Sequence, residues 1–411
     1  MKKSRTVDHG PWSMDPKPHR RFRSLVPGPW SLVFFFLLAC SAKELPHPPA
    51  APTTPSDEAL WNDPKGTRLG LLLPLSGQYK HYGEAILNGV SCAAGLYEPC
   101  AMPARPARVL AKDTQGDPVV AAAAAQELIE TEKVSALIGP LLSQEVEAVT
   151  SIAQDKKVPL IVLAPQKKGG SPRPYVFQHS LIPEKEVAQI ILKARAAGLE
   201  NFALFCPDNH YGRQYQELFR QQVEKEAAGK ILAEAVYPVD LPDFTETLRR
   251  FLPRNAKAGP LGLFVPDSFR QVIKIAEALD ALAFPNVRLI GTSRWHHPKL
   301  LARRSPSLEG ALIDTPFYDA DPQVLPFREN FLKAFGTEPA WLEAIGFDAA
   351  QLISQAVQTK GTDHPQAVRD GLGSIENFQA VVGPLSWDPE GISDWPFDFL
   401  TIQDRRFIPL P

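Results

Sequence analysis

Small polar side chains follow short apolar runs in this chain of 411 residues, and they are the first candidates for chemistry. Residues 68–77, RLGLLLPLSG, end at Ser76 and Gly77, and residues 261–268, LGLFVPDS, end at Asp267 and Ser268. Hydroxyl and carboxylate groups form hydrogen bonds, and the N–H groups at the start of a following helix attract anions. These residue types suit the binding of a small polar or carboxylate ligand.

Seven such runs alternate with amphipathic stretches of good helix formers, which predicts β-α units and parallel sheets. Ligands bind outside the carboxyl ends of the strands in open α/β sheets, so these ends are the predicted site. The alternative is that Gly, Pro, Ser and Asp only make βα turns, but their recurrence favours a site. The runs are 68–77, 107–116, 135–143, 158–166, 201–212, 261–268 and 287–295, and six of them end in Ser76-Gly77, Ser143-Gln144, Gln166-Lys167, Asp208-Asn209, Asp267-Ser268 and Thr292-Ser293.

Motifs for catalysis are absent from the sequence. It contains no G-x-x-x-x-G-K-[ST], G-x-G-x-x-G, G-x-S-x-G or H-E-x-x-H pattern. The adjacent His296 and His297 are expected to point apart, and no third residue has the spacing of a metal ligand. The sequence therefore predicts a protein that is not an enzyme and needs no cofactor or metal.

Residues 1–39 have the features of an export signal. Seven basic residues precede the apolar run LVFFFLLA at 32–39, which is too short to span a bilayer but fits a secretory signal. Leu37-Leu38-Ala39-Cys40 resembles the lipobox of bacterial lipoproteins, which implies cleavage before Cys40 and lipidation of that residue. A plain signal peptide is the alternative. The basic segment is long, so Met14 is a more typical start than Met1.

Residues 40–66 are expected to form a tether. They are rich in proline and lack a hydrophobic period, which predicts an extended spacer between the lipid and the folded part. Ser41 follows the cysteine, and by resemblance to bacterial lipoproteins this favours the periplasmic side of the outer membrane over the inner membrane.

Charge argues against nucleic acid as a partner. Residues 1–39 hold seven of the 44 basic and two of the 46 acidic residues, so cleavage leaves 37 basic and 44 acidic residues and a net charge of −7. Binding of phosphates requires clustered cations.

The remaining cysteines have structural roles in this interpretation. Cys92 and Cys100 are candidates for a disulfide that closes a small loop, since an exported protein meets oxidising conditions. Cys206 ends the apolar run FALFC and is expected to be a buried thiol.

Several segments together resemble the type I periplasmic binding proteins of the leucine/isoleucine/valine-binding group. The opening, residues 69–89, carries Ser76-Gly77, Tyr82-Gly83 and Asn88-Gly89. The resemblance covers nearly everything after residue 66, in the order of the family. It continues through DTQGDP (113–118), ALIGPLLS (136–143), PDNHYG (207–212), GFDAAQL (346–352) and VVGPLSWDPEG (381–391).

The resemblance implies an α/β fold of two Rossmann-like lobes joined by three crossings. Lobe one would comprise residues 67–179 and 311–378, and lobe two residues 180–310 and 379–411. A ligand would bind in the cleft between the lobes and favour their closure. The expected ligand-binding residues are Ser76, Gly77, Tyr82, Ser143 and Gln166 in lobe one, and Tyr211, Asp267, Ser268 and Ser293 in lobe two.

The expected site departs from the amino-acid pattern of that family. Lysines follow Gln166 where a threonine is expected, and Thr292-Ser293-Arg294 stands where an acid would hold the ammonium group. Either Asp267 replaces that acid or the ligand is not an amino acid.

Two functions remain open. The first is capture of an amino acid, short peptide or similar carboxylate for an ABC transporter. The opening also resembles a domain of the outer-membrane lipoproteins that activate penicillin-binding proteins, which implies regulation of a peptidoglycan synthase through protein contacts. The partner is then a small ligand with a permease, or a cell-envelope protein.

Overall fold

The computed structural model describes residues 66–100, 107–165, 173–226, 229–252, 259–302 and 304–410. The expected signal, Cys40, nearly all of the tether and Gln166 lie outside these ranges. The described residues all belong to the unit formed by Pro52–Pro411. Within them, no helix has both the length and the apolar character that a membrane span requires.

Lobe one is built on a parallel five-stranded sheet with the order β2-β1-β3-β4-β5. Both faces of this sheet are covered, which explains the continuous apolar runs in the sequence. Leu71 faces one hydrophobic cluster and its neighbour Leu72 faces another. The strands are β1 (Thr67–Leu73), β2 (Ala107–Asp113), β3 (Ala136–Ile138), β4 (Leu160–Val162) and β5 (Val176–Gln178).

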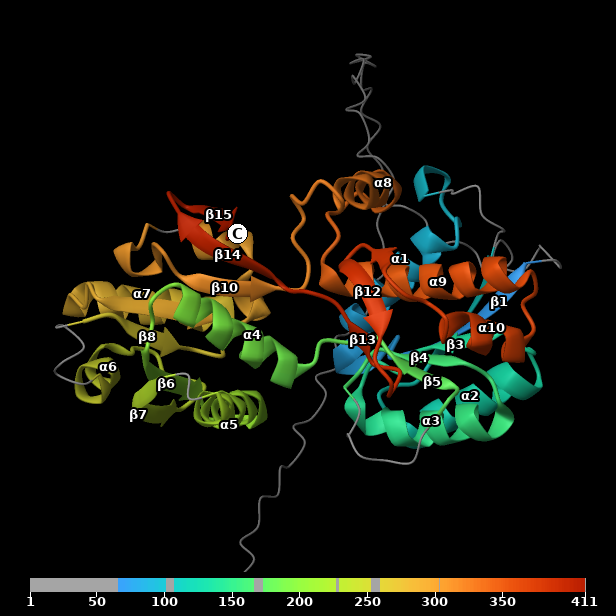
Figure 1. Ribbon diagram of the computed structural model, residues 1–411, viewed down its shortest axis with the longest axis horizontal. Coiled ribbons are helices and arrows are strands. Elements are labelled where there is room, and N and C mark those ends of the chain that lie inside the picture. The colour runs from blue at the N-terminus through green and yellow to red at the C-terminus, as the bar shows by residue number, and fades with distance from the viewer. Residues whose placement is uncertain are drawn as a thin grey trace, which may run out of the picture. The chain divides into compact units, whose positions relative to one another are not determined.

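Helices of lobe one lie on the two sides of this sheet (Figure 1). α1 (Lys80–Ala93) and α9 (Trp341–Lys360) share a cluster with Leu71, whereas α2 (Pro118–Glu130) and α3 (Ser143–Lys156) share one with Leu72. α2 begins where the Asp117 side chain accepts hydrogen bonds from the amides of Val119 and Val120. α8 (Leu325–Phe335) and α10 (Pro365–Leu372) complete the helices of this lobe.

Lobe two contains a seven-stranded sheet with the order β15-β14-β10-β9-β8-β6-β7. The part from β7 to β10 is parallel and repeats the strand order of lobe one. β14 and β15 extend it with antiparallel pairing. The strands are β6 (Asn201–Pro207), β7 (Lys230–Tyr237), β8 (Leu261–Phe264), β9 (Val287–Gly291), β10 (Leu312–Thr315), β14 (Asp398–Gln403) and β15 (Arg406–Pro409).

Side chains of β6 alternate between the two faces of this second sheet. Phe205 packs with α6 (Thr245–Phe251) and α7 (Phe269–Leu282), whereas Phe202 packs with α4 (Pro183–Ala196) and α5 (His210–Lys225). All seven strands that the sequence predicted are present. β5, β7, β10, β14 and β15 were not predicted. β5 follows Pro174 and lacks the longer apolar run that contains β3 or β4, and β7 is an edge strand whose side chains alternate in exposure.

Three chain segments connect the lobes: residues 179–182, 316–324 and 395–397. They confirm the predicted fold of two α/β lobes with three crossings, but two predicted boundaries are wrong. β10 pairs with β9 and therefore belongs to lobe two, although residues from 311 onward were assigned to lobe one.

The second correction concerns residues 379–394. β11 (Phe378–Ala380), β12 (Gly383–Trp387) and β13 (Ser393–Asp394) form a small sheet, and Leu385 joins the core of lobe one instead of that of lobe two. Burial of Leu385 in the cluster that includes α1 and α9 decides this placement. The sequence of a strand as short as β12 does not show which lobe it joins.

Cysteine chemistry agrees with the sequence. Cys92, near the end of α1, forms a disulfide with Cys100, with a Cα–Cα distance of 5.1 Å. Cys206 is a fully buried thiol in β6, and burial raises its pKa.

Candidate functional site at the strand ends

Both sheets reverse their strand order at one internal point. In lobe one this switch point lies between β1 and β3, and in lobe two it lies between β6 and β8. Crevices at such points are where ligands bind in open α/β sheets. Ser76 follows β1 and Ser143 follows β3, while Tyr211 follows β6 and Ser268 follows β8. The predicted residues therefore border both switch points.

The turn after β1 is exposed at Ser76, and Asp113 at the end of β2 anchors it through hydrogen bonds. Ser76 has an extended backbone and Gly77 a φ of +69°, which glycine adopts without strain. The Asp113 carboxylate accepts hydrogen bonds from the Leu75 and Gln115 amides at 2.8 and 2.9 Å. Partial burial acts to raise the pKa of Asp113, but bonds from Ser76, Leu75 and Gln115 lower it overall.

Tyr82 and Ser143 are also exposed in lobe one. Tyr82 retains 41% exposure, and its ring lies 3.8 Å from the His81 ring. Ser143 begins α3, and the first turn of this helix contains Glu145, which is fully buried. Burial raises the pKa of Glu145. The nearby Thr114 hydroxyl and Leu142 amide act to lower the pKa of Glu145, but neither forms a well-aligned hydrogen bond with its carboxyl group.

A glycine brings each tyrosine-bearing helix close to its strand end. A Cβ atom on Gly83 would lie 2.1 Å from the Pro74 carbonyl oxygen, and one on Gly212 would lie 2.2 Å from the Pro207 carbonyl oxygen. Neither distance tolerates a side chain. The Tyr82-Gly83 and Tyr211-Gly212 pairs therefore place the two tyrosines at equivalent positions of the two lobes.

Tyr211 is fixed on three sides in lobe two. Its hydroxyl is hydrogen-bonded to the Thr292 hydroxyl at 2.9 Å, and its ring lies 4.3 Å from that of Tyr215. The guanidinium carbon of Arg294 lies 4.6 Å from the centre of the Tyr211 ring, within the range of a cation–π contact. Arg294 itself is exposed.

A buried pair of carboxyl groups lies next to this tyrosine. Glu186, in the first turn of α4, is fully enclosed, and Asp314 of β10 is 1% exposed. Glu186 accepts hydrogen bonds from the Ser293 hydroxyl at 3.2 Å and from the Tyr215 hydroxyl. Burial and mutual repulsion raise the pKa of Asp314, and burial raises that of Glu186, which favours the protonated form of each carboxyl group.

Asp267 and Ser268 follow β8. The two oxygens of Asp267 accept from the Tyr237 hydroxyl at 2.7 Å and from the Ser268 amide at 2.6 Å. Ser268 precedes the first residue of α7 and is half-buried. Asp267 is therefore committed to holding the end of β8.

A second buried pair lies at the first crossing. His179 Nε2 is 4.0 Å from Asp348 Oδ2, and both side chains are buried. Asp348 accepts from the amides of Val381 and Val382. Burial lowers the pKa of His179 to about 3 and raises that of Asp348 to about 7.

His296 and His297 point apart, as expected. The His296 ring is 4.8 Å from Phe407, whereas the His297 ring stacks on Phe269 at 3.9 Å. No group of three or more metal-binding side chains occurs among the residues that the structure describes.

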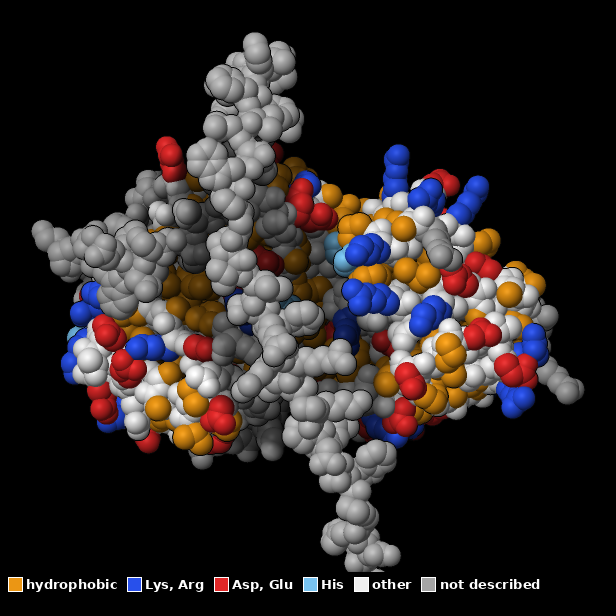
Figure 2. All heavy atoms as spheres, turned by 180° about the vertical axis from the view of Figure 1, so that it is seen from behind, with side chains coloured by type: hydrophobic (Ala, Val, Ile, Leu, Met, Phe, Trp, Pro, Cys, Tyr) orange, Lys and Arg blue, Asp and Glu red, His pale blue; other side chains and the backbone are white. Residues whose placement is uncertain are grey.

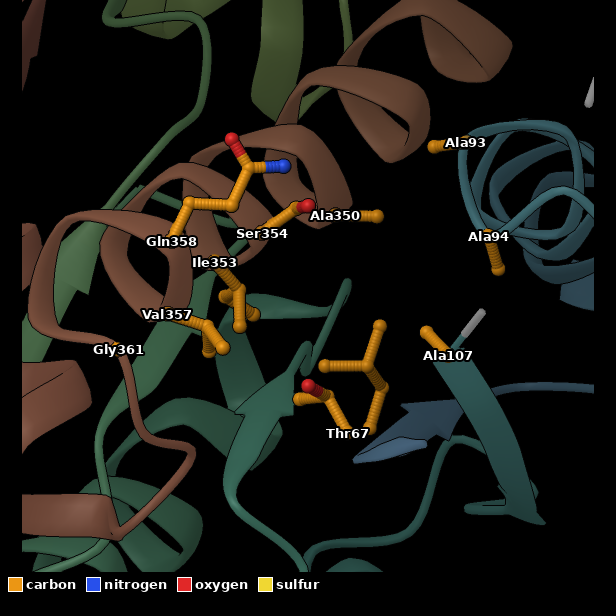
Figure 3. Close-up of a pocket in the computed structure, with 11 residues that line it drawn as sticks. Thr67, Ala93, Ala94, Ala107, Ala350, Ile353, Ser354, Val357, Gln358 and Gly361 are labelled. Atoms are coloured by element: carbon orange, nitrogen blue, oxygen red, sulfur yellow. The ribbon is translucent and has the colours of Figure 1, made fainter. Parts of the chain in front are cut away.

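A cavity of about 230 Å³ lies elsewhere in lobe one, between α1, α9 and the first residues of β1 and β2 (Figure 3). Its walls are mostly alanine and branched apolar side chains, with Thr67, Ser354 and Gln358 as polar members. β1 separates it from Ser76 by roughly 20 Å at about 3.3 Å per residue, so it is not part of the predicted site.

The sequence predicted most of the strand-end residues but not the buried residues that form hydrogen bonds or contacts with them. Ser293 was predicted as a ligand contact, yet its hydroxyl and amide both donate to Glu186. Glu186, Asp314 and Tyr215 were not predicted, because a helix acid, a strand acid and a helix tyrosine meet only in the tertiary fold. Arg294 was noted only as a departure from the amino-acid pattern.

The chain belongs to the periplasmic binding protein family, whose sequence profile matches residues 66–393. The Leu/Ile/Val-binding protein homolog 6 of Brucella suis is 23% identical over 336 residues, which cover 79% of this chain and 84% of that protein. Glutamate receptor 1.1 of Arabidopsis thaliana is 42% identical over 53 residues, so the match spans 13% of this chain and only 7% of that relative.

Solved structures share the fold at low identity. A putative branched-chain amino acid ABC transporter protein from Rhodospirillum rubrum has a TM-score of 0.72 at 20% identity, covering 84% of this chain and all of that one. A solute-binding protein of an ABC transporter from Rhodopseudomonas palustris, in complex with benzoate, has a TM-score of 0.62 at 21% identity, covering 84% and 95%.

Proposed function

We propose that this protein captures a small carboxylate-bearing solute between its two lobes and delivers it to an ABC-type transporter. The observation that supports this most is the pair of switch points, each bordered by hydroxyl groups and helix starts. Family membership supports the same function, since relatives are described as binding proteins for amino acids or benzoate.

The proposed ligand contacts are Ser76, Gly77, Tyr82 and Ser143 from lobe one and Tyr211 and Ser268 from lobe two. Gln166 completes the proposed set, whereas Ser293 and Asp267 are left out because both already form hydrogen bonds within lobe two. The exposed Ser76 and Ser143 would contact the ligand, and the starts of α3, α5 and α7 would add positive helix ends. Binding would stabilise a closed arrangement, because only then do both lobes contact the ligand.

Nothing in this proposal requires catalysis or nucleic acid. Acidic and basic side chains are interspersed on both lobes in the face shown in Figure 2. We propose that residues 1–39 direct export, that Cys40 carries lipid at the periplasmic face of the outer membrane, and that the proline-rich segment acts as a tether.

A thermal-shift screen of the purified protein tests the proposed function. Amino acids, short peptides, aliphatic and aromatic acids and muropeptides form the panel. A ligand at 100 times its Kd should add about 2.7 kcal/mol to the free energy of unfolding. A Ser76→Ala, Ser143→Ala double variant should lose most of the shift. If no solute raises the melting temperature, capture is wrong, and regulation of a peptidoglycan synthase becomes the better hypothesis.

The lipid anchor has a separate test. Cells that express the full chain are fed a labelled fatty acid, and the protein should take up label and sediment with membranes. Cys40→Ser should abolish both effects, whereas Cys206→Ser should not. Label in the Cys40→Ser variant would rule out the proposed anchor.

A further inference from the structure

We infer that lobe two binds a ligand carboxylate through Arg294 and offers no partner for an α-ammonium group, so the ligand is a carboxylic acid without an amino group. This inference rests on the proposed function and names the class of solute. It concerns the end of β9 and the residues around it, all within one lobe.

Arg294 is positioned before any ligand arrives. It lies in the short 3-10 helix Ser293–Trp295 after β9, and its guanidinium covers the Tyr211 ring. Tyr211 is in turn held by Thr292 and Tyr215. A guanidinium that stacks on a ring directs its N–H donors sideways in its own plane, where they match the two oxygens of a carboxylate.

The charge of Arg294 lacks a partner inside the described part of the chain, where no carboxylate forms an ion pair with it. Two exposed arginines of the same lobe, by contrast, are paired: Arg213 with Asp208, and Arg249 with Glu246. An exposed but fixed cation beside a switch point is therefore available for an anionic ligand.

Four acidic side chains at or near the ends of β6, β8, β9 and β10 are already engaged or enclosed. Glu186 and Asp314 are buried, so a ligand cannot reach them. Both oxygens of Asp267 accept hydrogen bonds, and Asp208 is paired.

Lobe one repeats this situation. Asp113 holds the amides of Leu75 and Gln115, and Glu145 is fully buried. An ammonium group that enters a site without a free carboxylate loses its hydration and gains no charged partner, which is costly. The burial or engagement of these six acids, Asp113, Glu145, Glu186, Asp208, Asp267 and Asp314, therefore favours an acid over the matching amino acid.

Calorimetry with matched ligand pairs tests this inference. The pairs are 4-methylpentanoate with leucine and 3-phenylpropanoate with phenylalanine, and benzoate is a further acid. At least one acid should bind, and its amino-acid counterpart should bind at least 10-fold more weakly. Arg294→Gln should weaken acid binding by about 10- to 100-fold, the range expected for lost hydrogen bonds to a charged group.

Two variants serve as controls. Arg249→Gln removes the same charge from an exposed helix of the same lobe and should leave binding unchanged. Asp267→Asn should also leave acid binding within about 3-fold, because Asp267 has no charged role in this inference.

The outcomes separate the two proposals. If amino acids bind as tightly as the acids or more tightly, or if Arg294→Gln has no effect, the inference is wrong while solute capture stands. Loss of amino-acid binding in Asp267→Asn would identify that residue as the ammonium partner and would also overturn it. If no ligand of the broader panel binds, the proposed function fails together with the inference.

Discussion

The two lobes share one strand order and a Tyr-Gly pair at the start of the helix after their first strand, but the residues at their strand ends are held differently. In lobe one Tyr82 is 41% exposed, and Ser76 and Ser143 are exposed residues. In lobe two Tyr211 is bonded to Thr292 and covered by Arg294, and Ser293 is bonded to Glu186. Equivalent positions of a repeated fold thus differ in how far they are organised before binding.

This difference indicates that the two lobes contribute to ligand binding at different stages. A fixed group loses little entropy on binding, so lobe two is suited to first contact with an anionic ligand. The exposed groups of lobe one would become ordered afterwards, when the lobes close. Predictions that alter one lobe and its counterpart in the other test this comparison.

The largest effect is expected at the buried acids. Glu186→Ala leaves the Tyr215 hydroxyl and Ser293 without their acceptor and should lower the free energy of unfolding by about 3 kcal/mol. In lobe one, Glu145→Met replaces a buried acid that accepts no well-formed hydrogen bond, so it should be neutral or stabilising. Urea unfolding measures both. Equal losses in the two variants would contradict the comparison.

The close approach of Gly83 and Gly212 to a strand end predicts similar losses of stability in both lobes. Gly83→Ala and Gly212→Ala each place a Cβ atom against a backbone carbonyl oxygen and should cost about 2–3 kcal/mol. Gly259→Ala is the control, since a Cβ atom there has no neighbour within 4 Å among the residues that the structure describes. Thermal unfolding compares the three. A loss in only one lobe would show that the two helix starts are not equivalent.

The His179–Asp348 pair predicts opposite pH slopes in two variants. The pKa of Asp348 is raised to about 7, so its contribution to stability falls as pH rises from about 4 to 7. The pKa of His179 is lowered to about 3, so its contribution falls as pH drops below about 6.5. The two slopes nearly cancel between pH 4.5 and 6.5 in the parent protein.

Single variants should remove this cancellation. Relative to the parent, His179→Gln should lose about 2 kcal/mol of stability between pH 4.5 and 6.5, and Asp348→Asn should gain about as much over the same interval. Urea unfolding at the two pH values measures the change. Parallel pH profiles for the parent and both variants would exclude these pKa shifts.

The smallest effect concerns the two tyrosine hydroxyls. Tyr211→Phe removes the bond to Thr292 and should cost about 1 kcal/mol of stability. Tyr82→Phe changes an exposed ring and should alter stability by less than about 0.5 kcal/mol. The difference in melting temperature between the two variants is the measurement. The reverse order would mean that lobe one is the better organised lobe.

Much of the fold was predictable because local signals agree with it. Continuous apolar runs such as that of β1 indicate strands buried on both faces, and the proline and glycine that follow indicate the turn into a helix. The disulfide between Cys92 and Cys100 and the buried Cys206 were also within reach of the sequence. The lobe boundaries were not, because β10 and β12 are too short to reveal their partners.

The sequence by itself determined the alternation of strands and helices, the polar strand ends and the absence of catalytic motifs, since these depend on residue order alone. Only the tertiary structure decided that Glu186 meets Asp314, that Arg294 covers Tyr211, and that β11–β13 join lobe one. The physical reason is burial: a carboxyl group or a short strand acquires its role from groups far away in the chain, which desolvate it, donate to it or cover it.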